Sequence, residues 1–499
     1  MLRLAIYGFL AAAVLGGGEI AYRHTLRDQG RFVPIAGDVF VLYGVGESTM
    51  TGQPYPQSVS PLMLTRTLLG GRIGGREIDV HNLAQPSSGI ISQSLRFEAE
   101  VTFRDRSIPG AVLIYSGHNE GFGPRETEGG PVSWLVDVGL LKYSAILTDL
   151  LIYLEANRII TPPEGLHHRS ERYLRRLIES ALAVGLRPIL FTLPSNTAGI
   201  EPNARSAEMP EVRAILDAGA ELEAKGMMQA AAAHYRAAYE AAVSQRKPSA
   251  PLLLYRAARC EEMLGQYDAA RRDYWLVVDS DSRQNFGRAT TVQNGLIRSL
   301  GVEYRIPVVD GVAAFERAAP HGILGNELFA DGHHPNLEGY RLLAEECVAR
   351  LAEVLPAERT EGLADVDGII AALGISAANM RSAHLMAGSW LLSASAYHPW
   401  PRDRMDLAEA HFRAALASND DVSALLGIAL SQGARDGKLL SEDEVVDELG
   451  RAHQFYTEFL SVSPGLWEKL LPRLRDRGVE EQILARLDLL LTGRGSAPL

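Results

Sequence analysis

The stretch VFVLYGVGEST, residues 39–49, decides the fold. Its first seven residues form a continuous run rich in β-branched and aromatic side chains, which is typical of a strand buried on both faces of a parallel sheet. The run ends in a glycine-flanked turn that carries Ser48. A hydroxyl in such a turn lies beyond the carboxyl end of its strand, where open α/β sheets place their ligand sites.

Four more short apolar runs alternate with longer helical patterns along the chain. This alternation is the signature of a parallel sheet covered by helices on both faces, so the predicted fold class is α/β. Each run is followed, at once or nearly so, by Gly, Ser, Pro or Asn. The five predicted strands are Val39–Val45, Ile78–Leu83, Ala111–Ser116, Pro188–Leu193 and Ile306–Asp310.

Two loops after later strands carry groups that complement a serine nucleophile. The third strand runs into Gly117-His118-Asn119, and the loop after the second strand contains Gly89. A side-chain amide or a free backbone N–H aimed at the serine stabilises the oxyanion of acyl transfer, an effect of about 3 to 4 kcal/mol per donor. Asn and Gly are also ordinary turn residues, so neither loop decides the chemistry alone.

The segment Asp331-Gly332-His333-His334-Pro335 follows the last strand. An Asp three residues before a His on a tight turn fixes the imidazole tautomer, and the other ring nitrogen then takes the serine proton. This spacing favours His334 over its neighbour His333 as the base. A metal site made of His321 with this segment is the weaker reading, because no further ligand set with the usual spacing accompanies it. We therefore predict neither a metal nor a cofactor.

Taken in order, these blocks resemble the four blocks of SGNH (GDSL-like) hydrolases, over about residues 31–200 and 285–355. The resemblance implies a three-layer αβα flavodoxin-like parallel sheet. It also implies that Ser48 is the nucleophile, that Asp331 and His334 are its relay, and that Ser48, Gly89 and Asn119 form the oxyanion hole. The chain departs from the family at Glu47, where the family usually has Asp; the change lengthens the side chain without removing a catalytic group.

An Ala-rich helical pattern from about residue 210 to 279 separates the last two predicted strands and is too long for an ordinary connection. Two sets of residues in it are spaced alike: Gly226, Ala231, Tyr235 and Ala238, then Gly265, Ala270, Tyr274 and Val277. This spacing resembles tetratricopeptide repeats, with a generic helical hairpin as the alternative. A third helical region follows Leu355, and its segment 407–416 has a similar pattern.

These patterns predict five regions along the chain. They are an anchor or signal peptide over 1–24, the first part of the hydrolase domain over 31–203, a tetratricopeptide-like insertion over 204–284, the second part of the hydrolase domain over 285–356, and a C-terminal helical, repeat-like domain over 357–499.

Composition excludes other classes of function. The chain has 499 residues and a formal net charge of -12 without any Lys/Arg block, so nothing favours a nucleic-acid partner. Its two cysteines, Cys260 and Cys347, stand in helical patterns and indicate neither a disulfide framework nor a zinc module. We interpret both as buried thiols, with a single bridge as the alternative in an exported protein.

An uninterrupted apolar run, Leu4–Gly18, opens the chain before Glu19. It is long for a signal-peptide core and short for a spanning helix, and no Ala-x-Ala-like cleavage site follows it. The favoured interpretation is an uncleaved membrane anchor that holds the catalytic domain outside the cytoplasm, in the periplasm or cell envelope. Secretion after signal cleavage and a buried core helix are the alternatives.

The predicted activity is hydrolysis of a carboxylic ester through an acyl-enzyme at Ser48. O-acyl transfer to an envelope polysaccharide by the same residues is the first alternative. A catalytically inactive, membrane-tethered scaffold that works through its helical repeats is the second. The predicted partners are an ester or acylated carbohydrate substrate, a protein at the helical repeats, and the membrane at the N-terminal segment.

Overall fold

The computed structural model describes most of the chain. The described residues are 16–28, 31–35, 37–121, 141–156, 166–202, 210–281, 287–356, 365–395, 398, 400–416, 421–439, 460 and 462–493. The predicted apolar run Leu4–Gly18 therefore lies almost wholly outside them. Among the described helices, none combines the length and the apolar character needed to cross a membrane.

A six-stranded sheet with the order β2-β3-β1-β4-β5-β6 lies at the centre of the fold. All neighbouring strands are parallel except β2, which runs antiparallel to β3. The five predicted strands each agree within two residues with an observed strand, and the short β2 is additional. The strands are β1 (Val39–Gly46), β2 (Arg72–Ile73), β3 (Arg76–Asn82), β4 (Gly110–Tyr115), β5 (Arg187–Phe191) and β6 (Val308–Val309).

The two central strands, β1 and β4, are almost wholly buried, which explains their continuous apolar sequences. Their register places Gly46 opposite Tyr115. A Cβ at Gly46 would lie 2.3 Å from the carbonyl oxygen of Tyr115 and 2.8 Å from the Cβ of Met50, so only glycine fits there. This close approach brings the turn after β1 beside the loop after β4.

Two groups of helices pack on this sheet and share its hydrophobic core. One group contains α3 and α12, which both contact α13; the other contains α4, α5, α6 and α11. The result is an α/β fold. The bounds are α2 (Ser48–Thr51), α3 (Pro61–Leu68), α4 (Ile90–Val101), α5 (Ala145–Ala156), α6 (Leu166–Ala183), α11 (Thr291–Tyr304), α12 (Gly311–Ala318), α13 (Leu337–Val354) and α14 (Val366–Leu373).

A helix over residues 16–27 packs on α5. The carboxylate of Glu19 accepts a hydrogen bond of 2.6 Å from the backbone N–H of Ala145 in the first turn of α5. Asp149, further along α5, accepts hydrogen bonds from Tyr22 and Arg31, each at 2.8 Å. The helix over residues 16–27 is thus hydrogen-bonded to α5 of the α/β unit.

Four helices, α7–α10, lie between β5 and β6 and form the helical insertion. Gly226 and Gly265 adopt φ of +71° and +76° in the turns that precede α8 and α10, a conformation that favours glycine. The ring of Tyr235 on α8 and that of Tyr274 on α10 are fully buried. The bounds are α7 (Pro210–Ala224), α8 (Met228–Ser244), α9 (Ala250–Met263) and α10 (Tyr267–Ser280).

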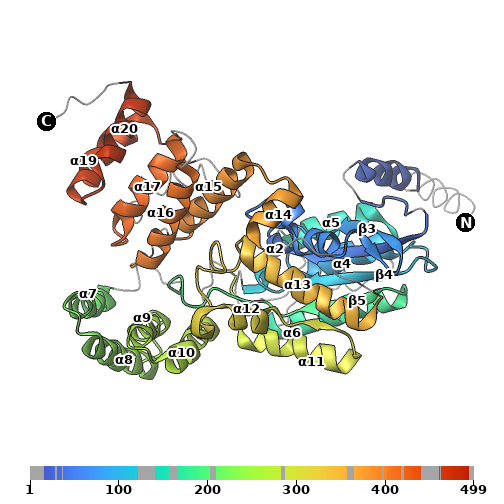
Figure 1. The fold of residues 1–499 in the computed structure, drawn as a ribbon, viewed down its shortest axis with the longest axis horizontal. Coiled ribbons are helices and arrows are strands. Elements are labelled where there is room, and N and C mark those ends of the chain that lie inside the picture. The colour runs from blue at the N-terminus through green and yellow to red at the C-terminus, as the bar shows by residue number, and fades with distance from the viewer. Residues whose placement is uncertain are drawn as a thin grey trace, which may run out of the picture.

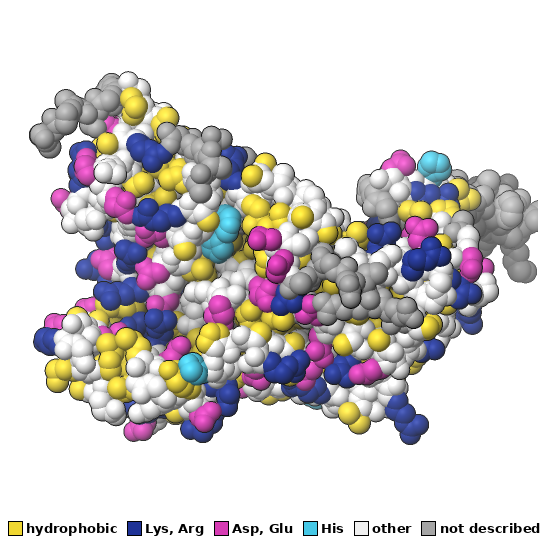
Figure 2. Space-filling view, viewed as in Figure 1, with side chains coloured by type: hydrophobic (Ala, Val, Ile, Leu, Met, Phe, Trp, Pro, Cys, Tyr) yellow, Lys and Arg dark blue, Asp and Glu magenta, His cyan; other side chains and the backbone are white. Residues whose placement is uncertain are grey.

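The C-terminal helices build a hydrophobic core of their own, which also takes in Ile200 from the loop after β5. They and the helical insertion extend as two arms from the α/β unit (Figure 1), and Figure 2 shows the surface hollowed between the arms. The first of them, α15, contributes Ala383 to the sheet core and Leu391 to the C-terminal core. The bounds are α15 (Ala377–Ala394), α16 (Arg402–Leu416), α17 (Val422–Ala434), α19 (Pro464–Asp476) and α20 (Glu481–Thr492).

Both cysteines are buried and free. Cys260 lies on α9 and Cys347 on α13, so they belong to different parts of the molecule. Burial raises the pKa of Cys260 to about 11 and that of Cys347 to about 12, and both thiols stay protonated at neutral pH.

Candidate active site

Ser48 is the first residue of α2, directly beyond the carboxyl end of β1. Its backbone N–H belongs to the first turn of the helix, where N–H groups have no intrahelical acceptor. The side chain is only 3% exposed. An ester carbonyl therefore reaches the hydroxyl only through a narrow opening or after a covering side chain moves.

The loop that carries Asp331 and His334 is closed on itself. Phe329 and Pro335 form an isolated β-bridge, and the N–H of Ala330 donates to the carbonyl of His334 at 2.9 Å. One carboxylate oxygen of Asp331, Oδ1, accepts the backbone N–H groups of His333 and His334, each at 2.9 Å. These local bonds orient the carboxylate so that Oδ2 faces the imidazole of His334.

Ser48, His334 and Asp331 form one hydrogen-bonded chain. Ser48 Oγ lies 2.6 Å from His334 Nε2, and His334 Nδ1 lies 2.6 Å from Asp331 Oδ2. Burial alone would raise the pKa of the fully buried Asp331, but the charge and the hydrogen bond of His334 hold it well below the ordinary range. The ionised carboxylate keeps the proton on Nδ1, which leaves Nε2 to accept the proton of Ser48.

His333, the competing histidine, does not contact Ser48 by any described hydrogen bond. Its ring lies next to those of His118, at a centroid distance of 4.8 Å, and His334, at 4.0 Å, and is tilted against both. Burial, with the positive charge of His334, lowers the pKa of His333 well below the ordinary value, so its ring is neutral. His321, the fourth member of the alternative metal site, is elsewhere: its ring stacks on Tyr267 at 3.5 Å.

Without His321, the alternative metal site consists of three residues. Asp331, His333 and His334 bring ligand atoms within 4.8 Å of one another. However, Asp331 Oδ2 and both ring nitrogens of His334 are engaged in the serine relay. Only His333 keeps uncommitted nitrogens, and one imidazole does not hold a divalent cation.

The predicted oxyanion donors lie on two loops joined by hydrogen bonds. The side-chain amide of Asn119 donates from Nδ2 to the carbonyl oxygen of Ser88 at 3.1 Å. The next residue, Gly89, is the N-cap of α4 and has extended backbone angles. The amide of Asn119 therefore stands at the turn that holds Gly89, and its second N–H remains for another acceptor.

Glu47 connects this arrangement to the serine turn. Its buried carboxyl group accepts the N–H of Gly117 at 2.7 Å and that of Asn119 at 3.0 Å. Burial raises the pKa of Glu47 to about 8, against the effect of these two hydrogen bonds. Gly117 has a φ of +145°, and a Cβ there would lie 2.7 Å from Leu193, so the loop needs glycine. Glu47 thus places Asn119 relative to its own neighbour, Ser48.

Three residues that contact the relay escaped the sequence analysis. Asn196, beyond β5, donates from its amide to the carbonyl of Asp331 at 2.8 Å, and the rule that polar residues follow strands could have found it. The other two lie on the C-terminal helices. Trp390 on α15 stacks on His334 at a centroid distance of 4.7 Å, and His411 on α16 contacts the carbonyl of Ala330 at 2.7 Å. No motif marks either one.

The fold and the site define a Ser-His-Asp arrangement at the carboxyl edge of an α/β sheet. The sequence matches no protein-family model, and it matches no curated protein. Among solved structures, a GDSL-like lipase from Bacteroides thetaiotaomicron is similar at 13% identity, covering 68% of this chain and 100% of that chain, with a TM-score of 0.31. A lipase/acylhydrolase from Enterococcus faecalis is similar at 14% identity, covering 64% of this chain and 100% of that chain, with a TM-score of 0.31. At such TM-scores the likeness supports no functional conclusion, and the functional assignment rests on the geometry of the site.

Proposed function

We propose that the protein is a serine hydrolase of the SGNH type that cleaves a carboxylic ester through an acyl-enzyme. The observation that carries the proposal is the buried chain from Ser48 Oγ through His334 to Asp331. Three side chains from two distant parts of the sequence share two short hydrogen bonds in the order that serine catalysis requires. The complete relay argues against the alternative of an inactive scaffold.

The chain of hydrogen bonds supports a two-step reaction. His334 Nε2 removes the proton of Ser48 as Oγ attacks the ester carbonyl, and Asp331 stabilises the imidazolium that forms. The proton passes to the departing alcohol, which leaves the acyl group on Ser48. Water then attacks the acyl-enzyme with His334 as base, and the acid leaves as Ser48 regains its proton. No cofactor takes part in this mechanism.

The backbone N–H of Ser48, that of Gly89 and the amide of Asn119 are the proposed oxyanion hole. The hydrogen bond between Asn119 and Ser88 supports a common location for the last two donors. The two N–H groups held by Glu47 support a fixed position for the Asn119 loop. Donors fixed before reaction are effective because they need no reorganisation as negative charge develops.

The near-complete burial of Ser48 favours O-acyl transfer as a second candidate. An acyl-enzyme shielded from water survives long enough to meet a bound alcohol, such as a polysaccharide hydroxyl. An acceptor assay distinguishes the two reactions: a transferase moves the acyl group to the sugar faster than to water, whereas a hydrolase releases the free acid whether or not sugar is present.

We infer a flavodoxin-like, three-layer arrangement for the α/β unit. When the parallel strands β1, β3, β4, β5 and β6 are numbered 1 to 5 along the chain, their order across the sheet is 2-1-3-4-5, which is the flavodoxin-like order. Tetratricopeptide-like packing of the helical insertion is supported by the matched glycine turns before α8 and α10. Both helical regions are proposed to serve a protein partner.

We also propose that the N-terminal run is a retained membrane anchor and that the enzyme works in the cell envelope. The bond between Glu19 and Ala145 supports retention, because cleavage at the predicted boundary after residue 24 would remove Glu19 and this bond with it. The intact mass of the mature protein tests this: a mass lacking the first 24 residues would exclude the anchor.

The test of the activity uses the full chain in mild detergent and a series of p-nitrophenyl esters from short to long acyl chains. Ser48→Ala and His334→Ala should each lower kcat by about 10⁴-fold or more. His321→Ala is the matched control, since its ring stacks on Tyr267 away from the relay, and it should keep the wild-type rate. Equal activity in the wild type and Ser48→Ala would refute the serine mechanism.

A further inference from the structure

We propose that the C-terminal helices complete the active site by supplying Trp390, a positioning residue that confines the imidazole of His334 and stabilises its charged form. The inference rests on the proposed function, because it concerns the base of the serine mechanism. On this inference, the docking of the C-terminal helices on the α/β unit contributes to catalysis.

Four rings form a column through the site. His118, His333, His334 and Trp390 follow one another at centroid distances of 4.8, 4.0 and 4.7 Å, with interplanar angles of 32°, 38° and 31°. The catalytic imidazole therefore has two aromatic rings close to it, that of His333 at 4.0 Å and that of Trp390 at 4.7 Å. Its two nitrogens are directed along the ring edge to Asp331 and Ser48. These ring contacts, together with the bonds at both nitrogens, leave the imidazole one orientation, which proton transfer requires.

Trp390 and His333, whose rings neighbour His334, have different effects on a positive charge on the His334 imidazole. When His334 takes the serine proton it becomes a cation, and the π face of a tryptophan within about 6 Å attracts a cation. Trp390 meets this distance. His333, the other neighbouring ring, stays neutral and adds no repulsion. Because the serine mechanism generates this cation as the proton of Ser48 is transferred, the effect of Trp390 falls on the chemical step and not on substrate binding.

Independent contacts hold α15 and α16 against the catalytic loop. His411 Nε2 donates to the carbonyl oxygen of Ala330, the residue before Asp331, at 2.7 Å. Its other nitrogen lies 2.9 Å from Nδ1 of His384 on α15, which carries Trp390. The two helices that frame Trp390 are thus bonded to each other and to the segment that bears the base.

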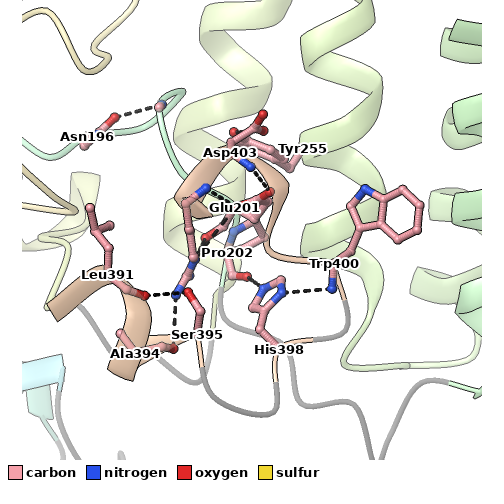
Figure 3. A network of polar contacts seen from close by, with 12 residues as sticks. Asn196, Glu201, Pro202, Tyr255, Leu391, Ala394, Ser395, His398, Trp400 and Asp403 are labelled. Carbon is pink, nitrogen blue, oxygen red and sulfur yellow. Dashed lines mark hydrogen bonds and ion pairs between the residues drawn. The ribbon is translucent and has the colours of Figure 1, made fainter. Parts of the chain in front are cut away.

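A buried polar cluster fastens the same helices from the other side (Figure 3). The carboxylate of Glu201, in the loop after β5, accepts the backbone N–H of Asp403 at 2.6 Å and that of Arg404 at 3.1 Å. The guanidinium of Arg404 donates back to the carbonyl of Glu201, and His398 donates to that of Pro202 at 2.8 Å. Trp390 therefore stands on a helix pair fixed to the α/β unit at two places.

The experiment measures labelling of the full chain by a fluorophosphonate, with kinact and KI determined separately. Trp390→Leu removes the aromatic face and should lower kinact roughly 3- to 30-fold with KI unchanged. Trp390→Phe, which keeps an aromatic face, should recover most of the rate. Trp275→Leu is the matched control, a half-buried tryptophan on α10 that bonds Glu316, and it should label at the wild-type rate.

Fluorinated tryptophan keeps the protein folded if Trp390→Leu does not fold. Fluorine withdraws charge from the ring face without changing its shape, so kinact should fall as fluorine atoms are added to the five tryptophans. The decline should vanish in Trp390→Phe. An unchanged kinact in Trp390→Leu, a change confined to KI, or a fluorine effect that persists in Trp390→Phe would each overturn the inference. A wild type that is not labelled at Ser48 would instead overturn the proposed function.

Discussion

Removing the carboxyl group of Glu47 should damage both the stability and the rate of the enzyme. In the wild type this buried side chain accepts the N–H groups of Gly117 and Asn119 and so fixes the loop that carries an oxyanion donor. Glu47→Ala leaves two buried N–H groups without their acceptor. Glu47→Gln keeps one oxygen for Gly117 but turns an N–H₂ group toward the N–H of Asn119.

The magnitude follows from these two bonds. A buried donor left without an acceptor costs about 1 to 3 kcal/mol, so Glu47→Ala should lose roughly 2 to 6 kcal/mol of unfolding free energy. If Asn119 also moves out of place, one oxyanion donor is lost and kcat should fall about 10²- to 10³-fold. Glu47→Gln disturbs one hydrogen bond instead of two, so its unfolding free energy and its kcat should both lie between those of the wild type and those of Glu47→Ala.

The assay combines urea unfolding with ester turnover for the wild type and the two variants. Glu338→Ala is the matched control, because it deletes an acid on α13 whose partner Arg341 lies on the same helix, and it should leave kcat unchanged. If Glu47→Ala loses stability yet keeps the wild-type kcat, Glu47 supports the fold only and its placement of Asn119 is refuted.

Three further perturbations have defined outcomes. Asn119→Ala should lower kcat about 10²- to 10³-fold with the unfolding midpoint little changed, and a rise in KM alone would contradict its oxyanion role. Glu19→Ala removes the acceptor at the start of α5 and should destabilise the protein by about 0.5 to 2 kcal/mol in thermal unfolding, whereas an unchanged midpoint would show that the helix over residues 16–27 adds nothing to stability. Burial lowers the pKa of His411 to about 4, so the unfolded chain binds that proton first as the pH falls. The stability that this group contributes should be complete above about pH 6.5 and lost toward pH 4, and hydrogen-exchange protection of α15 and α16, corrected for the intrinsic exchange rate, that shows no decrease over this range would contradict it.

The strands β1 and β4 could be predicted because a strand buried on both faces leaves a continuous apolar run ended by turn residues. The convergence of Ser48 with the Asp331 loop follows from the same pattern, since the carboxyl ends of parallel strands share one edge. The two-residue strand β2 was missed because so short an antiparallel pair has no periodicity to detect. The predicted domain boundaries and the repeat assignment stay predictions.

The contribution of the C-terminal helices to the site could not be predicted. Trp390 and His411 reach His334 and Ala330 only because α15 and α16 dock on the catalytic loop, and docking geometry is not encoded in a local pattern. The position of Glu47 was visible as a departure from the family's usual Asp. Its hydrogen bonds to Gly117 and Asn119 depend on the register of β1 against β4, which short-range spacing does not contain.

The most direct test of the central claim is peptide mapping by mass spectrometry after the full chain reacts with a fluorophosphonate. We expect a single adduct on Ser48 that is absent from Ser48→Ala and slowed by about 10⁴-fold or more in His334→Ala. No adduct on Ser48, or an adduct that forms equally fast without His334, would contradict a nucleophile activated by the His334–Asp331 relay.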